Sequence, residues 1–283
     1  MNRTIDKAVI TVAGLGKRMR PLSDVVPKAM LPLVGRRGRV LPVLHHILAE
    51  AASAGIGQAA IVVSPNHERM LREYVQAAGE ANLSDLPNQI EFIVQAQPLG
   101  FGHAVWLARG FVGGGPFMLM LGDHVHLPDD GQGSCTEQVA EAFASVGGAA
   151  MVGMQPVGPD ELPRVGVAAG APVQGDIYRC TDFVEKPDLA TARSRLATPG
   201  LETDRFLAHN GIYVFTQEIF DCLEGLIPDE CKPGREVQLA DAQLSLLKGH
   251  PQDYYLVRVR GRAYDVGTPA GYAATLAALS GRG

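Results

Sequence analysis

A glycine turn followed directly by basic side chains is the strongest chemical signal in this sequence. The segment K-A-V-I-T-V-A-G-L-G-K-R-M-R-P combines a strand-like run with two glycines, and Arg18 and Lys28 follow closely. Glycine lets a backbone approach a phosphate chain and present N–H groups to it. Arginine and lysine neutralise the phosphate charge, and arginine adds a forked donor. We therefore predict a phosphate-cradling loop formed by Ala13, Gly14, Gly16 and Lys17.

Two common phosphate-binding motifs do not fit this loop. A dinucleotide-binding fingerprint requires G-x-G-x-x-G, and Met19 stands where its third glycine belongs. A P-loop requires G-x-x-x-x-G-K-[ST], which is absent from the sequence. Dehydrogenase and P-loop NTPase activities are therefore disfavoured.

Two isolated aspartates predict a metal site. Asp123 directly follows the apolar run F-M-L-M-L-G, and Asp265 lies in R-A-Y-D-V-G-T. Carboxylates at the ends of parallel strands face the ligand crevice, and Mg²⁺ prefers one or two carboxylates together with phosphate oxygens. We expect both aspartates at one cleft, sharing Mg²⁺; a turn or helix-cap role is the alternative. His124 and His126 also permit a zinc site, which we consider weaker because no further soft ligand is evident.

A glutamine after an apolar strand is the candidate base-reading residue. Gln95 lies in V-Q-A-Q-P-L-G-F-G-H-A, and its amide offers a donor and an acceptor that suit a pyrimidine edge. Gln97 is the competing residue, but the spacing of Gln95 to His103 favours Gln95. Gly102 would allow close approach of the base or ribose.

The motifs resemble the signature of the sugar-nucleotide pyrophosphorylases, a nucleotidyltransferase family, and especially its bacterial UTP–glucose-1-phosphate uridylyltransferases. V-A-G-L-G-K-R-M-R-P and P-K-A-M-L-P-L match the signature, although Lys17 stands where the family has threonine. Further matches follow in family order: L-G-D-H with Asp123, R-V-G-V with Gly166, F-V-E-K-P with Glu185 and Lys186, R-E-V-Q-L-A-D-A with Glu236, and Y-D-V-G-T with Asp265.

The resemblance implies an enzyme that transfers a nucleotidyl group to a sugar 1-phosphate and releases pyrophosphate. Arg18 and Lys28 would contact the nucleotide phosphates, and Lys186 would contact the sugar phosphate or the α-phosphate. Gly166, Glu185 and Glu236 would bind the sugar, although Glu185 and Lys186 could simply pair with each other. UTP and glucose 1-phosphate are the expected substrates. Alternatives are dTTP or another nucleotide, a cytidylyltransferase acting on a non-sugar phosphate, or a catalytically silent nucleotide-binding regulatory subunit.

The elements that must position these residues alternate between strand and helix. Apolar, β-branched runs at 8–12, 59–63, 90–94 and 117–121 are separated by helical patterns at 42–54, 66–78 and 103–109. This alternation predicts a Rossmann-like α/β fold with a mixed, mostly parallel sheet. Later runs at 164–169 and 177–184 predict a smaller antiparallel portion. We expect one domain, residues 1–283, with a nucleotide-binding half (1–150) and a sugar-binding half (151–283).

The charge distribution favours a local anion site rather than a nucleic-acid-binding surface. Residues 1–40 contain nine Lys/Arg and two Asp/Glu, a net charge of +7, within a chain whose net charge is −5. Arg36, Arg37 and Arg39 lie in an apparent insertion that would be a docking patch for anionic substrate, an interface or a solvated loop. His45 and His46 are expected at the surface or at an interface. Four scattered cysteines and no membrane or signal segment predict a cytoplasmic protein, expected to be a dimer or tetramer.

Overall fold

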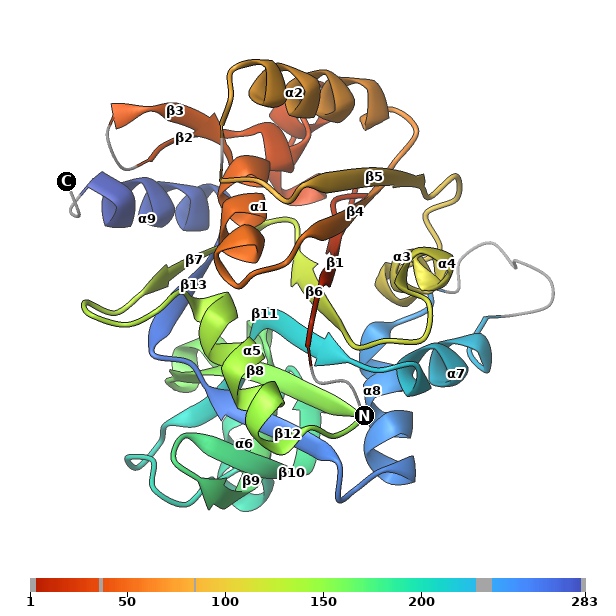
Figure 1. The fold of residues 1–283 in the computed structure, drawn as a ribbon. Coiled ribbons are helices and arrows are strands. Elements are labelled where there is room, and N and C mark those ends of the chain that lie inside the picture. Colours follow the sequence, from red (N-terminus) through yellow and green to blue (C-terminus); the bar gives the residue numbers. More distant parts are fainter. Residues whose placement is uncertain (1–3, 36–37, 84, 228–235, 281–283) are drawn as a thin grey trace.

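A computed structural model describes residues 4–35, 38–83, 85–227 and 236–280. A nine-stranded mixed sheet runs through it in the order β5-β4-β1-β6-β11-β8-β12-β10-β9 (Figure 1). Its strands are β1 (Lys7–Thr11), β4 (Gln58–Val63), β5 (Gln89–Val94), β6 (Phe117–Leu121), β8 (Ala150–Val157), β9 (Gly166–Gln174), β10 (Ile177–Glu185), β11 (Phe206–Phe215) and β12 (Tyr254–Arg258). The sheet thus joins strands from both halves of the chain.

Pairing direction changes along the sheet. Strands β5, β4, β1 and β6 are parallel neighbours, and β8 pairs with β12 in parallel. Strand β11 is antiparallel to β6 and β8, and β10 is antiparallel to β9 and β12. The expected mixed α/β sheet is confirmed, with its parallel strands concentrated in the first half and the expected β9–β10 hairpin in the second.

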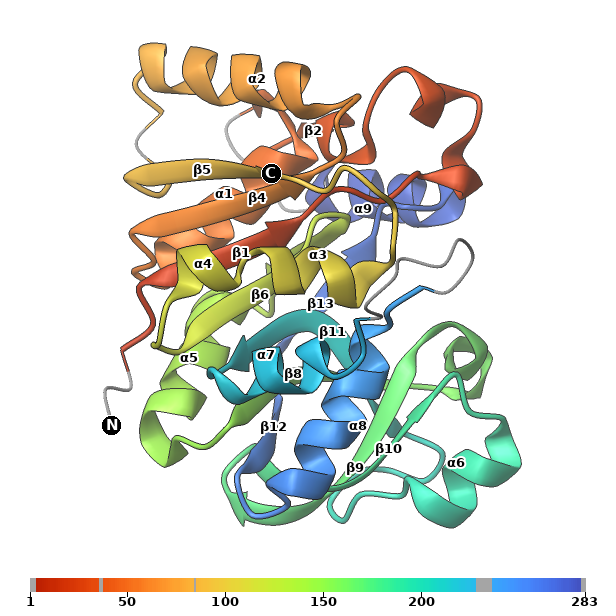
Figure 2. The same ribbon diagram turned by 90° about the vertical axis from the view of Figure 1, so that its right-hand side faces the viewer.

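Helices cover both faces of the sheet. They are α1 (Val43–Ser53), α2 (Glu68–Glu80), α3 (Phe101–Leu107), α4 (Arg109–Val112), α5 (Cys135–Val146), α6 (Leu189–Arg195), α7 (Glu218–Glu224), α8 (Leu239–Gly249) and α9 (Pro269–Ser280). Figure 2 shows α3, α4, α7 and α8 in front of the sheet, with α1 and α5 behind it. None of the described helices is long and apolar enough to span a bilayer.

The core explains this layering. Successive side chains of a strand point to opposite faces. Ala8 and Ile10 of β1 therefore pack into the apolar cluster under α1 and α5, whereas Val9 packs under α3 and α7. Because β1 is buried on both faces, it reads as a continuous apolar run in the sequence.

Two short ribbons lie outside the main sheet. One pairs β2 (Pro32–Val34) with β3 (Val40–Pro42), and the other pairs β7 (His124–Pro128) with β13 (Gly261–Asp265). The second ribbon brings segments far apart in the sequence side by side, which the sequence pattern did not predict.

Two expectations about surface residues have different outcomes. His45 is buried, with 1 % of its surface exposed, between the Tyr74 hydroxyl and the Asp85 carboxylate, so its expected surface position is wrong. Arg39 is exposed, whereas Arg36 and Arg37 lie outside the described residues.

Candidate active site

A cavity of about 430 Å³ opens at the carboxyl ends of β1 and β6. The loop after β1 forms one wall, and residues that follow β5 and begin α3 form another. The lining residues important for the chemistry are Ala13, Gly14, Gly16, Lys17, Arg18, Lys28, Gln95, Gly100, Asp123 and Glu236. The structure therefore brings the predicted phosphate loop, the predicted base reader and one predicted metal ligand to the same cavity.

The glycine loop has the form of a phosphate cradle. A Cβ added at Gly14 would meet no protein atom within 4 Å, so internal packing does not require glycine there. Gly16 adopts φ +60°, and a Cβ there would lie 2.9 Å from the Cβ of Ser23. Among the described residues, no backbone carbonyl accepts a hydrogen bond from the N–H groups of Gly14, Leu15 or Gly16. These donors are available to an anion in the cavity.

The two cations predicted to contact phosphate both pair with the predicted metal ligands. The Lys28 ammonium forms an ion pair with Asp123, and Arg18 Nη1 lies 3.3 Å from Asp265 Oδ2. Both cations line the cavity, where an anion can replace these carboxylates as their partner.

Asp123, His124 and Asp265 form a compact group of potential metal ligands. One ligand atom from each lies within 4.8 Å of the others. The β7–β13 ribbon brings the three side chains together. Asp265 and His124 are directly paired across it, and the Val266 N–H donates to the Asp123 carbonyl. Asp123 and Asp265 therefore lie close together, as the sequence led us to expect.

The second histidine of D-H-V-H lies outside this group. His126 is 6 % exposed, and its Nε2 lies 2.7 Å from the Asn210 carbonyl oxygen. Burial lowers the pKa of His126 to about 4, so it is neutral at pH 7 and its Nε2 donates to that carbonyl. The weaker alternative, a zinc site with both imidazoles as ligands, is therefore not supported by the position of His126.

Local charges keep Asp123 ionised. Burial raises the pKa of Asp123, but the hydrogen bond and charge of His124 and the ion pair with Lys28 outweigh it and hold this pKa well below its usual range. A carboxylate that stays charged at neutral pH is suited to holding a divalent cation.

Gln95 is held in one orientation at the cavity wall. It is 6 % exposed, and its Nε2 lies 3.0 Å from both the Gly100 carbonyl and His103 Nδ1. A carbonyl only accepts hydrogen bonds, so the amide NH₂ must face Gly100 and the Oε1 atom remains an acceptor for a ligand. The spacing of Gln95 to His103 thus has a direct structural cause.

Gly102 has a different role from the one expected. It does not line the cavity, and a Cβ there would lie 2.9 Å from the Val237 carbonyl oxygen. Its N–H donates to that same carbonyl at 2.8 Å. Gly102 therefore permits α3 to pack against Val237, and Gly100 is the glycine that faces the cavity.

Gly166 and Glu185, two of the three predicted sugar-binding residues, form a separate group with Lys186. Gly166 pairs directly with Glu185 across β9 and β10, and a Cβ on Gly166 would lie 2.7 Å from Glu185 Oε2. Lys186 Nζ lies 3.6 Å from Glu185 Oε1, so the alternative ion pair also exists. None of the three lines the 430 Å³ cavity. Glu236, which was grouped with them, instead lies at that cavity beside Gly100.

Comparison with known proteins agrees with this geometry. The family model described as "Nucleotidyl transferase" matches residues 7–280. The chain belongs to the nucleotidyl transferase family. The expectation of a nucleotidyltransferase enzyme is thereby confirmed, and the resemblance drawn from the motifs was correct.

Curated relatives and solved structures of named activity are similar to this chain. The chain is 33 % identical to a UTP–glucose-1-phosphate uridylyltransferase of Bacillus subtilis (strain 168), covering 96 % of this chain and 90 % of the relative. A Staphylococcus epidermidis protein of the same name is 32 % identical, with 96 % and 91 % covered. A UDP-glucose pyrophosphorylase solved with UDP-glucose superposes with a TM-score of 0.81 at 26 % identity, covering 99 % and 100 %. A UTP-bound enzyme from Acinetobacter baumannii gives 0.76 at 25 % identity, covering 99 % and 95 %.

Sequence reasoning missed Gly267 in this nucleotidyl transferase site. A Cβ there would lie 2.7 Å from Asp265 Oδ1, 2.8 Å from Asp123 Oδ2 and 2.9 Å from Lys28 Nζ. The Gly267 N–H also donates to Asp265 Oδ1 at 2.7 Å. Gly267 belongs to the motif Y-D-V-G-T, which the sequence analysis singled out for Asp265. Only the tertiary structure shows that the carboxylates of Asp265 and Asp123 both lie beside this glycine.

Aromatic side chains beside Gly166 were also missed. A Cβ on Gly166 would lie 2.9 Å from the Phe183 ring, and that ring stacks on His209 with centroids 4.7 Å apart. Tyr213 packs edge-on against His209. Burial, with the nearby Glu185 carboxylate, raises the pKa of Tyr213, so its hydroxyl stays protonated. Gly166 thus lies against a cluster of packed rings formed by Phe183, His209 and Tyr213, and the Glu185 carboxylate is near that cluster.

Proposed function

We propose that this enzyme transfers the uridylyl group of UTP to glucose 1-phosphate, forming UDP-glucose and releasing pyrophosphate in the presence of Mg²⁺. The proposal rests on one observation above all: a buried glutamine, whose amide NH₂ is held by the Gly100 carbonyl, lines the same cavity as the glycine loop. The names of the relatives that are 31–33 % identical over 96 % of the chain support the same substrates.

The free acceptor of Gln95 selects among bases. Uracil presents an N3–H donor to such an acceptor, whereas cytosine presents a lone pair at N3. Leaving a buried acceptor unsatisfied costs about 1–3 kcal/mol. UTP should therefore outcompete CTP by roughly tenfold or more. Thymine carries the same N3–H, so dTTP is the second candidate nucleotide.

Phosphate handling follows from the ion pairs. Arg18 and Lys28 leave Asp265 and Asp123 to contact the nucleotide's phosphates, which reduces repulsion between oxygens as the sugar phosphate approaches the α-phosphorus in line. The two freed carboxylates are the proposed holders of Mg²⁺, which would neutralise charge on the reacting phosphates. Lys186 is proposed to contact the sugar phosphate or the α-phosphate.

We propose that the sugar binds residues of the second half of the chain. Glu185 would accept hydrogen bonds from sugar hydroxyls, and the Gly166 backbone would approach the ring from the paired strand. We propose one domain with nucleotide binding centred in residues 1–150 and sugar binding in residues 151–283. Asp265 and Glu236 are the exceptions, because they reach the nucleotide side from the second half. A cytoplasmic dimer or tetramer remains part of the proposal.

A matrix of substrates tests the proposal. Purified enzyme is assayed for pyrophosphate release with UTP, dTTP, CTP, ATP and GTP against glucose 1-phosphate, galactose 1-phosphate and a non-sugar phosphate. We expect UTP with glucose 1-phosphate to give the highest kcat/KM and dTTP to rank second. A tenfold preference for ATP or GTP would overturn the base assignment. Absence of turnover with every pair would overturn the activity itself.

A further inference from the structure

His124 occupies the position of a third ligand beside the two carboxylates proposed to hold the metal. Its Nδ1 lies 3.1 Å from Asp123 Oδ1, and it belongs to the same compact group as Asp265. We propose that His124 coordinates the catalytic metal and makes this a site of two carboxylates and one imidazole, which binds Mn²⁺ more tightly than Mg²⁺. This inference rests on the metal-assisted transfer proposed above.

The backbone leaves His124 little freedom to be elsewhere. Directly paired residues of an antiparallel ribbon project from the same face, so the β7–β13 register sets the imidazole beside the Asp265 carboxylate. Asp123 is its immediate neighbour. On the other side, a Cβ on Gly211 would lie 3.3 Å from His124 Cγ and Cδ2, so the glycine leaves room for the ring. The ring also stacks near His126, with centroids 6.4 Å apart.

The separation of the donor atoms suits shared coordination. Two adjacent ligands of an octahedral ion with bonds of about 2.1 Å lie about 3 Å apart. The 3.1 Å between His124 Nδ1 and Asp123 Oδ1, a hydrogen bond in the metal-free protein, is close to that edge, and a metal ion would replace the Nδ1 proton, which is released on binding. His126 cannot substitute, because its Nε2 is committed to the Asn210 carbonyl and it lies outside the group.

Ligand chemistry gives the predicted selectivity. Mg²⁺ is a hard cation that binds oxygen and retains water, so replacing an oxygen by imidazole nitrogen weakens its hold. First-row transition metals accept imidazole readily, and their affinity for nitrogen-containing sites rises from Mn²⁺ onward. The site can still hold Mg²⁺ through its carboxylates, but the histidine adds affinity only for the softer ions.

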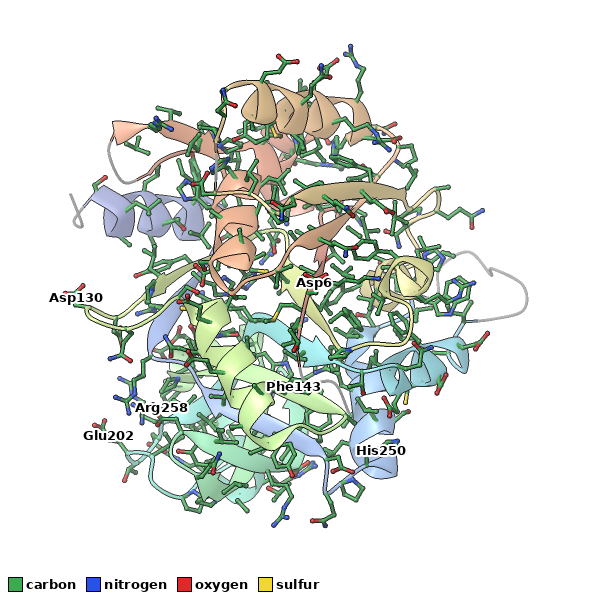
Figure 3. All side chains as sticks on the ribbon, viewed as in Figure 1. Asp6, Asp130, Phe143, Glu202, His250 and Arg258 are labelled. Carbon is green, nitrogen blue, oxygen red and sulfur yellow. The ribbon has the colours of Figure 1, made fainter. Side chains whose placement is uncertain are left out.

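Metal binding with UTP present and no sugar phosphate tests the inference, because the nucleotide is proposed to draw Lys28 and Arg18 away from the two carboxylates. Mn²⁺ is titrated into the UTP-bound protein, with UTP alone as the baseline, and free Mn²⁺ is followed by electron paramagnetic resonance, with Mg²⁺ affinity obtained by competition. We expect His124→Asn to weaken Mn²⁺ binding by about tenfold or more, while Mg²⁺ affinity changes by less than about threefold. The matched control is His250→Asn, at the end of α8 and outside the group, which should change neither affinity (Figure 3).

Electron spin-echo modulation of bound Mn²⁺ gives a second readout that needs no variant to fold. The wild-type protein should show nitrogen-14 modulation from a coordinated imidazole, and His124→Asn should lose it. Wild-type protein without nitrogen modulation, or an unchanged Mn²⁺ dissociation constant in His124→Asn, would overturn the assignment. Failure of the proposed reaction is separately visible, because it appears as absent pyrophosphate release with either metal.

Discussion

Glu50 on α1 is a half-buried acid whose protonation should control stability around neutral pH. Its Oε1 accepts hydrogen bonds from the Thr136 N–H at 3.0 Å and the Thr136 hydroxyl at 3.3 Å, at the first turn of α5. Burial raises the pKa of Glu50 from 4.5 to about 7, although the bonds from Thr136 partly oppose that rise. The folded protein therefore binds this proton more tightly than the unfolded chain does.

The sign and size of the effect follow from proton linkage. A raised folded-state pKa contributes stability that is fully present below the unfolded pKa and is lost as pH rises through the folded pKa. A shift from 4.5 to about 7 corresponds to about 3 kcal/mol, most of it lost between pH 5 and pH 8. Glu50→Gln keeps the side-chain carbonyl as an acceptor for Thr136 but removes the titrating group. The free energy of unfolding of the variant should therefore fall by that much less over the same pH interval.

Urea unfolding at pH 5, 6, 7 and 8 measures the difference directly. The wild-type free energy of unfolding should fall by about 2–3 kcal/mol more than that of Glu50→Gln between pH 5 and pH 8. Glu141→Gln, an exposed change on α5, is the matched control and should track the wild type. Parallel pH profiles for wild type and Glu50→Gln, within about 0.5 kcal/mol, would refute the reasoning.

Three further substitutions test the proposed site. Asp123→Asn should lower kcat by about 100-fold or more while thermal unfolding is little changed, because it removes a proposed Mg²⁺ ligand; near-normal turnover with Mg²⁺ would contradict that role. Gln95→Ala should lower kcat/KM for UTP by about tenfold and reduce discrimination against CTP, with the KM for glucose 1-phosphate unchanged; unaltered UTP-to-CTP preference would exclude it as the base reader. Gly267→Ala should cost about 100-fold in kcat/KM, because its Cβ would displace Asp265, Asp123 or Lys28; wild-type kinetics would show that the cluster tolerates the extra methyl group.

Local chemistry was readable from the sequence alone. The turn Gly14-Leu15-Gly16 and the following cations predicted the phosphate loop, because glycine and charge act over a few residues. The alternation of apolar runs predicted the parallel strands, because a strand buried on both faces must be continuously apolar. Gln95, predicted to read the base, lies at the cavity, since the strand before it and the helix after it leave it at the sheet's carboxyl edge.

Tertiary structure alone decided which distant residues meet. His124 joins the two aspartates only because β7 pairs with β13, and that register is set by contacts between segments more than 130 residues apart. A side chain at Gly267 would crowd the cluster, and one at Gly102 would crowd Val237, for reasons that lie in other elements. His45 is buried rather than exposed because Tyr74 and Asp85 satisfy both of its ring nitrogens. The sequence specifies these residues, but which of them come into contact depends on how the whole chain packs. A local sequence pattern holds no information about that packing.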